Sequence, residues 1–185
     1  MDMRHLTMTE LEAGLDEIRR APLDQGVLHM IVRRPLTGER EVVGEAHLDG
    51  ELGLVGDNWR ARGNPHTPDR APDPDAQLTV MSSRAIALVA RDRDRWPLAG
   101  DQLFVDLDLS AANLQPGTKL ALGTAVIEVT ATPHTGCGKF LQRFGLDAMK
   151  LVNSPLGREL QLRGVNTRVV TSGVIRVGDI ARKVT

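Results

Sequence analysis

The sequence predicts a mainly β fold, a closed or nearly closed β-barrel with a few helices. Short apolar or alternating segments, about eight of them, recur along the chain with the length and period of strands. Between them, 18 glycines and 10 prolines in 185 residues supply the turns. Only about three segments have helical spacing, too few for the strand–helix alternation of a parallel α/β sheet.

This length suits a single domain, spanning 1–185. It opens with an N-terminal helix over about residues 7–20. Thr9 and Glu12 have the spacing of a capping box, and Pro22 ends the helix. The apolar face of this helix consists of Leu11, Leu15 and Ile18.

The barrel is predicted over about residues 25–183 and begins with a hairpin. Gly26–Val32 and Arg40–Leu48 have strand patterns, and Pro35–Gly38 has the composition of the turn between them. The segment from Leu52 to Ala76 carries too many prolines for regular structure and is predicted to be a long loop. Long loops inside compact domains are usually functional or disordered.

From Gln77 onward, the sequence pattern predicts the remaining strands and two more helices. One helix covers Ser83–Trp96, starts at a serine cap and ends in a charged run that we expect to be solvated. The last two strands are predicted to form a hairpin. The expected strands are Gln77–Ser82, Leu103–Leu109, Lys119–Leu122, Ala125–Thr132, Val165–Thr171 and Val177–Val184.

Composition narrows the classes of function. A single cysteine excludes an internal disulfide and fits a reducing, cytoplasmic compartment. The first residues lack the pattern of a signal peptide, and no apolar run is long enough to span a membrane. A net charge of −1 and 3% aromatic residues give no basis for nucleic-acid binding. The expectation is a cytoplasmic protein with neither nucleic acid nor membrane as a partner.

The single cysteine, Cys137, is the candidate functional centre. It follows the apolar strand ending at Val129 and precedes a segment with helical spacing of Phe140, Leu141, Phe144 and Met149. A thiol at such a turn faces the positive end of a helix. Two neighbouring cations and a protonated histidine would add to the effect and favour the thiolate. These three residues are Lys139, Arg143 and His134.

The alternative is that Cys137 is a small buried hydrophobe, as most lone cysteines are. The flanking Gly136 and Gly138 leave room for a ligand to approach the sulfur, and with the local positive charge they favour a functional thiol. A cysteine protease with His66 or His134 as base has no further support in the local sequence.

Several blocks in this order resemble the MOSC domain, named for the C-terminal domain of molybdenum cofactor sulfurase. The resemblance covers about residues 25–183 and indicates a stand-alone member of bacterial type. The family's fold is a β-barrel of the kind found in pyruvate kinase. The blocks are Gly53–Asp57, Gly100–Val105, Asp108–Leu114, Pro116–Leu120, Gly123–Thr130, Pro133–Lys139 with Arg143, Gly157-Arg158, Gly164 with Arg168, and Gly173 with Gly178-Asp179.

The resemblance implies that Cys137 either binds the molybdenum of a pterin cofactor or carries sulfur as a persulfide. Both uses need an accessible, soft thiolate. The phosphate of such a cofactor needs cations and backbone amides. The residues expected to bind the cofactor are His134, Lys139, Arg143, Arg158, Arg168, His66 and Asp57.

Partners and alternatives follow from the same resemblance. A lone thiol needs an outside sulfur donor, and no residues for pyridoxal phosphate chemistry are recognisable. Some family members reduce N-hydroxylated bases or amines, which would require an electron-donor protein. A non-enzymatic barrel that binds a partner protein, with Cys137 buried, is the third reading. The chain departs from the family in lacking a Gly-Gly pair after His66.

Overall fold

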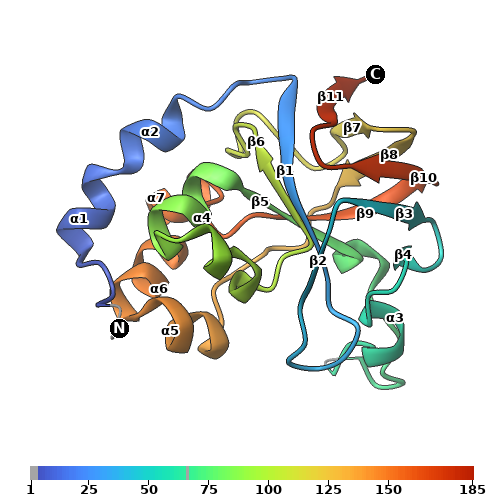
Figure 1. Cartoon of the computed structure of the whole chain (residues 1–185), viewed down its shortest axis with the longest axis horizontal. Helices are drawn as coiled ribbons and strands as arrows, with labels where there is room; N and C mark the ends of the chain where they lie inside the picture. The colour runs from blue at the N-terminus through green and yellow to red at the C-terminus, as the bar shows by residue number, and fades with distance from the viewer. Residues whose placement is uncertain (1–3, 66) are drawn as a thin grey trace.

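The computed structural model describes residues 4–65 and 67–185 and confirms the predicted closed β-barrel with a few helices (Figure 1). The strands of this part of the chain are β1 (Gly26–Arg33), β2 (Glu41–Val43), β3 (Glu45–Asp49), β4 (Gly53–Leu54), β5 (Leu78–Ser82), β6 (Leu103–Asp106), β7 (Lys119–Leu122), β8 (Ala125–Val129), β9 (Val165–Thr171), β10 (Gly173–Arg176) and β11 (Ile180–Val184). The helices are α1 (Met8–Ala13), α2 (Leu15–Arg19), α3 (Trp59–Arg62), α4 (Ser83–Ala90), α5 (Gly138–Phe144), α6 (Leu146–Asn153) and α7 (Pro155–Glu159), with 3₁₀ helices η1 (Pro74–Ala76) and η2 (Arg93–Ala99).

The barrel is a ring of seven strands in the order β11-β7-β8-β9-β5-β6-β1. The ring closes where Gly26 and Val27 of β1 pair with Ala181 and Ile180 of β11. Its pairs are antiparallel except for β5 with β6. β2 pairs with the other end of β1, and a separate small sheet joins β10, β3 and β4.

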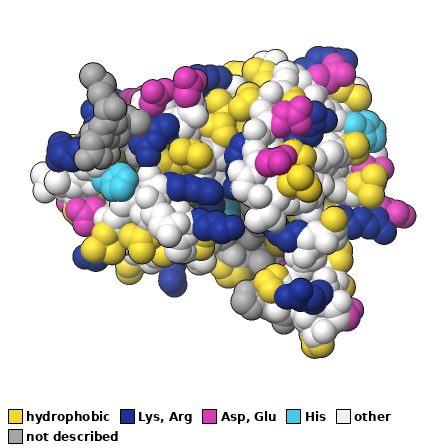
Figure 2. Space-filling view, turned by 60° about the horizontal axis from the view of Figure 1, so that its bottom comes forward, with side chains coloured by type: hydrophobic (Ala, Val, Ile, Leu, Met, Phe, Trp, Pro, Cys, Tyr) yellow, Lys and Arg dark blue, Asp and Glu magenta, His cyan; other side chains and the backbone are white. Residues whose placement is uncertain are grey.

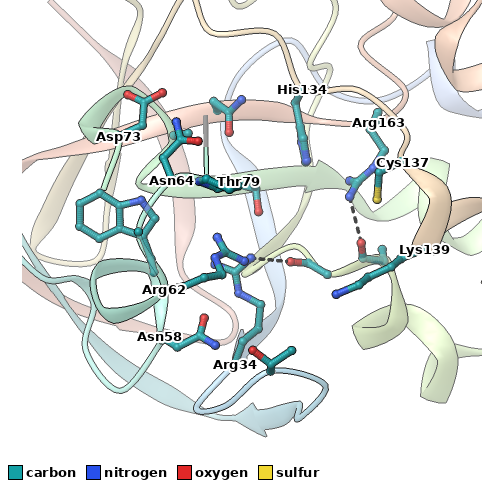
Figure 3. A pocket seen from close by; sticks show the side chains of 18 of the residues that line it. Arg34, Asn58, Arg62, Asn64, Asp73, Thr79, His134, Cys137, Lys139 and Arg163 are labelled. Atoms are coloured by element: carbon teal, nitrogen blue, oxygen red, sulfur yellow. Dashed lines mark hydrogen bonds between the residues drawn. The ribbon is translucent and has the colours of Figure 1, made fainter. Parts of the chain in front are cut away.

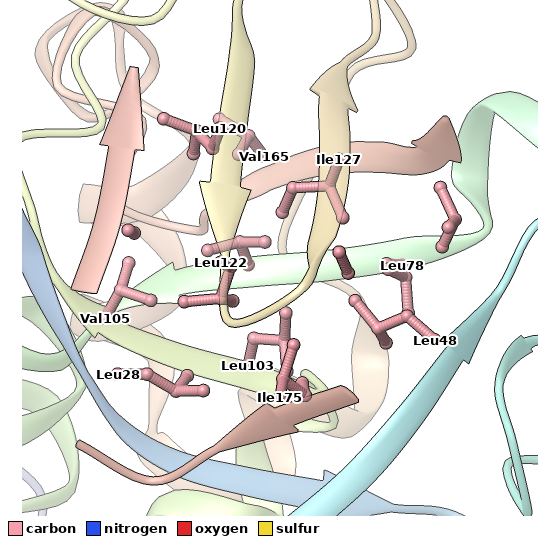
Figure 4. Close-up of a cluster of buried hydrophobic side chains, with 14 of the residues drawn as sticks. Leu28, Leu48, Leu78, Leu103, Val105, Leu120, Leu122, Ile127, Val165 and Ile175 are labelled. Atoms are coloured by element: carbon pink, nitrogen blue, oxygen red, sulfur yellow. The ribbon is translucent and has the colours of Figure 1, made fainter. Parts of the chain in front are cut away.

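Alternation along the strands builds two separate apolar clusters. In β6, Leu103 and Val105 point into the barrel, whereas Phe104 between them points out toward the helices. The barrel is filled mainly by branched aliphatic side chains, including Leu28, Leu120 and Ile127 (Figure 4). Because β6 contributes side chains to both clusters, the same sheet packs against the barrel interior on one face and against the helices on the other.

All the α-helices except α3 lie on one side of the barrel, whereas α3 lies on the other, below β4 (Figure 1). The second cluster lies between the barrel and this helical layer. Its largest members include Trp96, Phe104, Phe140 and Phe144. No helix in the described ranges is long and apolar enough to cross a membrane.

The N-terminal helix differs from the prediction in its start and its continuity. It is two short helices, α1 and α2, that meet at Gly14. The capping box uses Thr7 and Glu10 instead of Thr9 and Glu12. The expected apolar face is confirmed, because its three residues are all buried.

Two predicted hairpins pair differently. The segment Arg40–Leu48 breaks at Gly44, so that β2 pairs with β1 but β3 pairs with β10 and β4. The last two predicted strands do not pair with each other: β9 lies between β8 and β5, and β11 lies between β7 and β1. Both β9 and β11 therefore form their hydrogen bonds with strands that are distant in sequence, and not with each other.

The helix predicted over Ser83–Trp96 ends at Ala90, where Arg91 adopts a positive φ of 64°. The charged run after it forms η2 and is not simply solvated. Arg95 donates a hydrogen bond of 2.6 Å to the carbonyl of Arg143 in α5, and Arg93 donates one of 2.7 Å to the carbonyl of His29. These arginines fasten η2 to its neighbours.

Candidate functional site

A cleft of about 520 Å³ contains Cys137 in its lining. Its walls consist of residues from the β1–β2 connection, the segment around α3, the segment at Gly100 that precedes β6, the loop that ends at Cys137, and Arg143 of α5. On the face shown in Figure 2, Lys and Arg side chains gather around a hollow. Figure 3 places Cys137, Lys139, His134 and Arg163 toward one end of this cleft and Asn58, Asn64 and Asp73 toward the other.

Cys137 is exposed and is the N-cap residue of α5. The loop that carries it is held from two sides by asparagine side chains. Asn153 of α6 accepts a 2.9 Å hydrogen bond from the Gly136 amide, and Asn166 of β9 donates to the carbonyls of Thr132 and Pro133 at 3.1 and 3.2 Å. The exposed thiol excludes the alternative in which Cys137 is merely a buried hydrophobe.

The two glycines beside Cys137 differ in the space that a side chain would have at each position. A side chain at Gly136 would place its Cβ 2.7 Å from Met149 Sδ and 3.0 Å from Val152 Cγ2, so the close approach of the loop to α6 leaves little room for one. A Cβ at Gly138 would meet nothing within 4 Å. A side chain would therefore meet neighbouring atoms at position 136 but open space at position 138.

Among the described residues, six cationic side chains line the cleft, and Asp73 is the one carboxylate in its lining. In the part of the chain that the structure describes, two of the six are in ion pairs, Arg34 with Asp57 and Arg163 with Asp101. The other four make no ion pair there. They are Arg40, Arg62, Lys139 and Arg143.

Arg34 is anchored at the end of β1 by a buried carboxylate. Asp57 accepts from Arg34 Nε and Nη2, both at 2.8 Å, and from the Arg34 amide at 2.9 Å. The Asp57 side chain is fully buried, and Nη1 of Arg34 donates to the Gly100 carbonyl at 2.9 Å. This fork-shaped pairing fixes the guanidinium in the cleft wall.

Arg163 is the second anchored cation. Its Nη1 lies 2.5 Å from Oδ2 of the fully buried Asp101, and its Nη2 donates to the Ala99 carbonyl at 2.9 Å. The guanidinium carbon also lies 5.1 Å from the centre of the Phe140 ring. Since Phe140 belongs to α5, Arg163 braces the helix that begins at Cys137.

His134 lines the cleft as a neutral ring. Burial lowers the pKa of His134 to about 3, helped by the positive charges of Arg163 and Arg34 and opposed by Asp101. The expectation that a protonated His134 adds positive charge beside Cys137 is therefore wrong at neutral pH. Burial of the ring is the main reason for the difference, and the charges of Arg163 and Arg34 add to it.

Mutual repulsion acts on the unpaired cations as well. The pKa of Arg40 is lowered by burial and then by the charges of Arg143 and Arg34. Burial and Arg34 lower the pKa of Arg62 in the same way. Such crowding means that an anion in the cleft would be stabilised by several cations at once.

The structure brings together four of the residues expected at the site: Cys137, His134, Lys139 and Arg143. Asp57 lies behind the cleft wall as the partner of Arg34. Arg158 in α7 and Arg168 in β9 are not in the lining, and Arg168 is paired with Asp75 and Glu128 at the surface. His66 lies outside the described residues.

Sequence reasoning missed Arg34, Arg40, Arg62, Arg163 and the buried Asp101. Asp101 lies in the block Gly100–Val105 and Arg163 directly precedes Gly164, but nothing local marks their side chains as neighbours. Arg34, Asp101 and Arg163 meet because the end of β1 and the starts of β6 and β9 lie on the same side of the ring. A basic residue directly after a predicted buried strand, as in Arg33-Arg34, is the only signal that could have found one of them.

The described side chains do not form a ligand set for a bare metal ion. No group of three or more His, Cys, Asp or Glu side chains that could hold an ion occurs within residues 4–65 and 67–185. Cys137 is the thiol that the described cleft offers to a soft metal.

Comparison with known proteins supports the fold. No protein-family model matches the sequence, and no curated protein sequence matches it. The chain is similar in structure to the YuaD protein from Bacillus subtilis, with a TM-score of 0.61 and 14% identity over 85% of this chain and 94% of that one. It is also similar to YiiM from Escherichia coli, with a TM-score of 0.55 and 21% identity over 86% and 70%. YiiM from Geobacillus stearothermophilus has a TM-score of 0.53 and 16% identity over 89% and 75%. YiiM and YuaD are MOSC-domain proteins, and the shared feature is the barrel fold.

Proposed function

We propose that this chain is a MOSC-domain protein that holds a molybdenum–pterin cofactor in its cationic cleft, with Cys137 as the protein ligand to the metal. The observation that carries the proposal is an exposed thiol in the same cleft as four cations without carboxylate partners. The barrel shared with YiiM and YuaD supports it. A cytoplasmic location belongs to the same proposal.

The residues present suit such a group. A cofactor of this kind ends in a phosphate, and Arg40, Arg62 and Arg143 offer it guanidinium donors that no carboxylate occupies in the described chain. The cleft volume of about 520 Å³ lies within the range of pockets that bind small molecules. The amide and carboxylate side chains at the other end supply acceptors for ring N–H groups, and they include Asn58, whose buried Oδ1 has no partner in the described structure.

When bound, the cofactor would supply two-electron redox chemistry or a sulfur-binding metal. The chain's own contributions are positional. Cys137 presents its thiol, Arg163 braces α5 beneath it through Phe140, and Asp57 fixes Arg34 in the wall. Lys139, exposed two residues beyond the thiol, is placed to attract anions into the open end.

The test is the molybdenum and pterin content of protein purified from a host that makes the cofactor. We expect both in the wild type, loss of molybdenum in Cys137→Ser, and loss of both in the double variant Arg40→Gln/Arg62→Gln. Arg168→Gln, which removes an arginine outside the cleft, is the matched control and should retain both. Neither metal nor pterin in the wild type would refute the proposal.

A second function, sulfur carriage by Cys137 as a persulfide, is favoured by the same exposure of the thiol. It predicts labile sulfur on Cys137 after incubation with a cysteine desulfurase, without bound molybdenum. An electron-donor partner and reduction of N-hydroxylated bases or amines would become the next assay only if molybdenum and pterin are found together.

A further inference from the structure

The buried cluster of Asp101, His134 and Arg163 leaves part of its hydrogen-bonding capacity unused. Within the described chain, Oδ1 of Asp101, Nδ1 of His134 and Nε of Arg163 are all buried without a hydrogen-bond partner. Buried polar atoms are rarely left in this state. Asp101 and Arg163 are at least nine-tenths buried, and the His134 side chain is 16% exposed, on the cleft.

The distance between two of these atoms restricts where the proton of His134 lies. Nδ1 of His134 is 3.5 Å from Oδ1 of Asp101. With the proton on Nε2, the lone pair of Nδ1 would face a carboxylate oxygen at this distance, and the two would repel. With the proton on Nδ1, the same contact is electrostatically attractive, although 3.5 Å is longer than an ordinary hydrogen bond.

The opposite nitrogen is then an acceptor in the cleft. Nε2 makes no hydrogen bond in the described structure and is not among its buried unpartnered atoms, so it is the ring nitrogen open to the cleft. The charged groups that act on the ring are Asp101, Arg163 and Arg34. Two of the three are cations, which oppose protonation of Nε2 and keep its lone pair available.

We propose that Asp101 holds His134 as the Nδ1–H tautomer, and that Nε2 accepts a hydrogen bond from an O–H or N–H group of an anionic ligand in the cleft. The nearby cations attract negative charge without distinguishing one anion from another, because they are donors only. An acceptor among them selects the anion that also carries a proton. His134 is thus a specificity-determining residue, and the inference deepens the proposed function, on whose cleft it rests.

The tautomer is measured by long-range ¹H–¹⁵N correlation on histidine-labelled protein, with His134→Phe to assign the signals. The expected result is a protonated Nδ1 and an unprotonated Nε2 at neutral pH. Asp101→Asn should shift the proton to Nε2, because its amide donates to Nδ1 while its oxygen accepts from Arg163. An Nε2–H tautomer or a cationic ring in the wild type overturns the inference even if the Asp101 variant fails to fold.

Selection is measured with two inorganic probes of similar shape, hydrogen phosphate and sulfate, at mildly alkaline pH where both are dianions. Only hydrogen phosphate carries an O–H donor. Protection of Cys137 from alkylation reports occupancy of the cleft. We expect phosphate to bind about five- to tenfold more tightly than sulfate, the effect of one hydrogen bond, and the ratio to fall to near one in His134→Phe.

His47→Phe, the same substitution at an exposed histidine of β3, is the matched control and should keep the preference. Equal protection by the two anions in the wild type, no protection by phosphate, or an unchanged ratio in His134→Phe overturns the inference. Both experiments use protein from a host that does not make the cofactor, so the cleft is open to the inorganic anions. A failed phosphate preference in this protein, with molybdenum and pterin found in protein from a cofactor-making host, refutes only this inference, and the reverse outcome refutes only the proposed function.

Discussion

Replacing Asp57 by Asn tests whether the cleft wall depends on a buried ion pair. Asp57 is fully buried and accepts four hydrogen bonds, three from Arg34 and one of 3.0 Å from the Trp59 amide. Asn keeps the size but turns one acceptor oxygen into a donor, which then faces a donor of Arg34 or Trp59. The guanidinium of Arg34, only 10% exposed, loses its counter-charge.

Removing one partner of a buried ion pair costs about 3–5 kcal/mol of unfolding free energy. For a domain of this size each kcal/mol lowers the melting temperature by about 2–4 °C, so we expect a decrease of roughly 6–20 °C. Urea titration followed by circular dichroism gives the free energy directly.

The matched control is Glu41→Gln, which breaks the exposed pair of Arg33 with Glu41, whose side chains are 30% and 49% exposed. Such a pair contributes at most about 1 kcal/mol. If Asp57→Asn lowered the free energy of unfolding by no more than Glu41→Gln does, the assignment of Asp57 as the anchor of Arg34 would be refuted. The expectation that Asp57 binds the ligand directly would then be favoured.

Three further predictions concern the thiol, acid stability and one glycine. The ratio of the alkylation rate with iodoacetate to that with iodoacetamide should be about two- to tenfold larger for Cys137 than for free cysteine, because a cationic cleft attracts the anionic reagent. This ratio should fall with added salt and in Arg62→Gln, and the same ratio for Cys137 and free cysteine would contradict the cationic cleft. Because the pKa of His134 falls from 6.5 to about 3 on folding, the unfolded state binds more protons between these values, so stability is full above about pH 6.5 and decreases as the pH falls toward 3. His134→Phe should flatten this part of the pH–stability curve, and an unchanged slope would place the acid sensitivity elsewhere. Gly157→Ala would put a Cβ 2.0 Å from the Leu151 carbonyl oxygen and should cost about 1–3 kcal/mol, whereas Gly44→Ala, with nothing within 4 Å, should stay within about 0.5 kcal/mol in the same denaturation assay.

The strands were largely predictable because their pattern is local. β1, β5, β7 and β9 match apolar or alternating runs within one or two residues, and their number indicated a barrel. The helix cap was ambiguous because two Thr–Glu pairs share the same spacing, and Thr7 with Glu10 is the pair that forms. The end of α4 at Ala90 has no local signal, since the residue that breaks it is an arginine with positive φ.

The site was predictable only where it is continuous in sequence. The Cys137 loop and its neighbours Lys139 and Arg143 could be found because they lie in one short stretch of sequence after β8. Arg34, Arg62 and Arg163 could not, because their proximity depends on how segments that are distant in sequence pack together in the fold. The neutral state of His134 depends on a carboxylate and an arginine that are distant in sequence.

The seam between β1 and β11 has a consequence for the synthesis of the chain. The ring is sealed by strands from opposite ends of the described sequence, so β1 leaves the ribosome long before its partner exists. Until β11 arrives, part of the β1 edge exposes backbone groups that a second molecule can bind. The seam lies at the start of β1, at the opposite end of the strand from Arg34, where β1 pairs with β2 and β6 instead. Truncation before residue 180 should therefore yield self-associating protein whose barrel is open between β1 and β7.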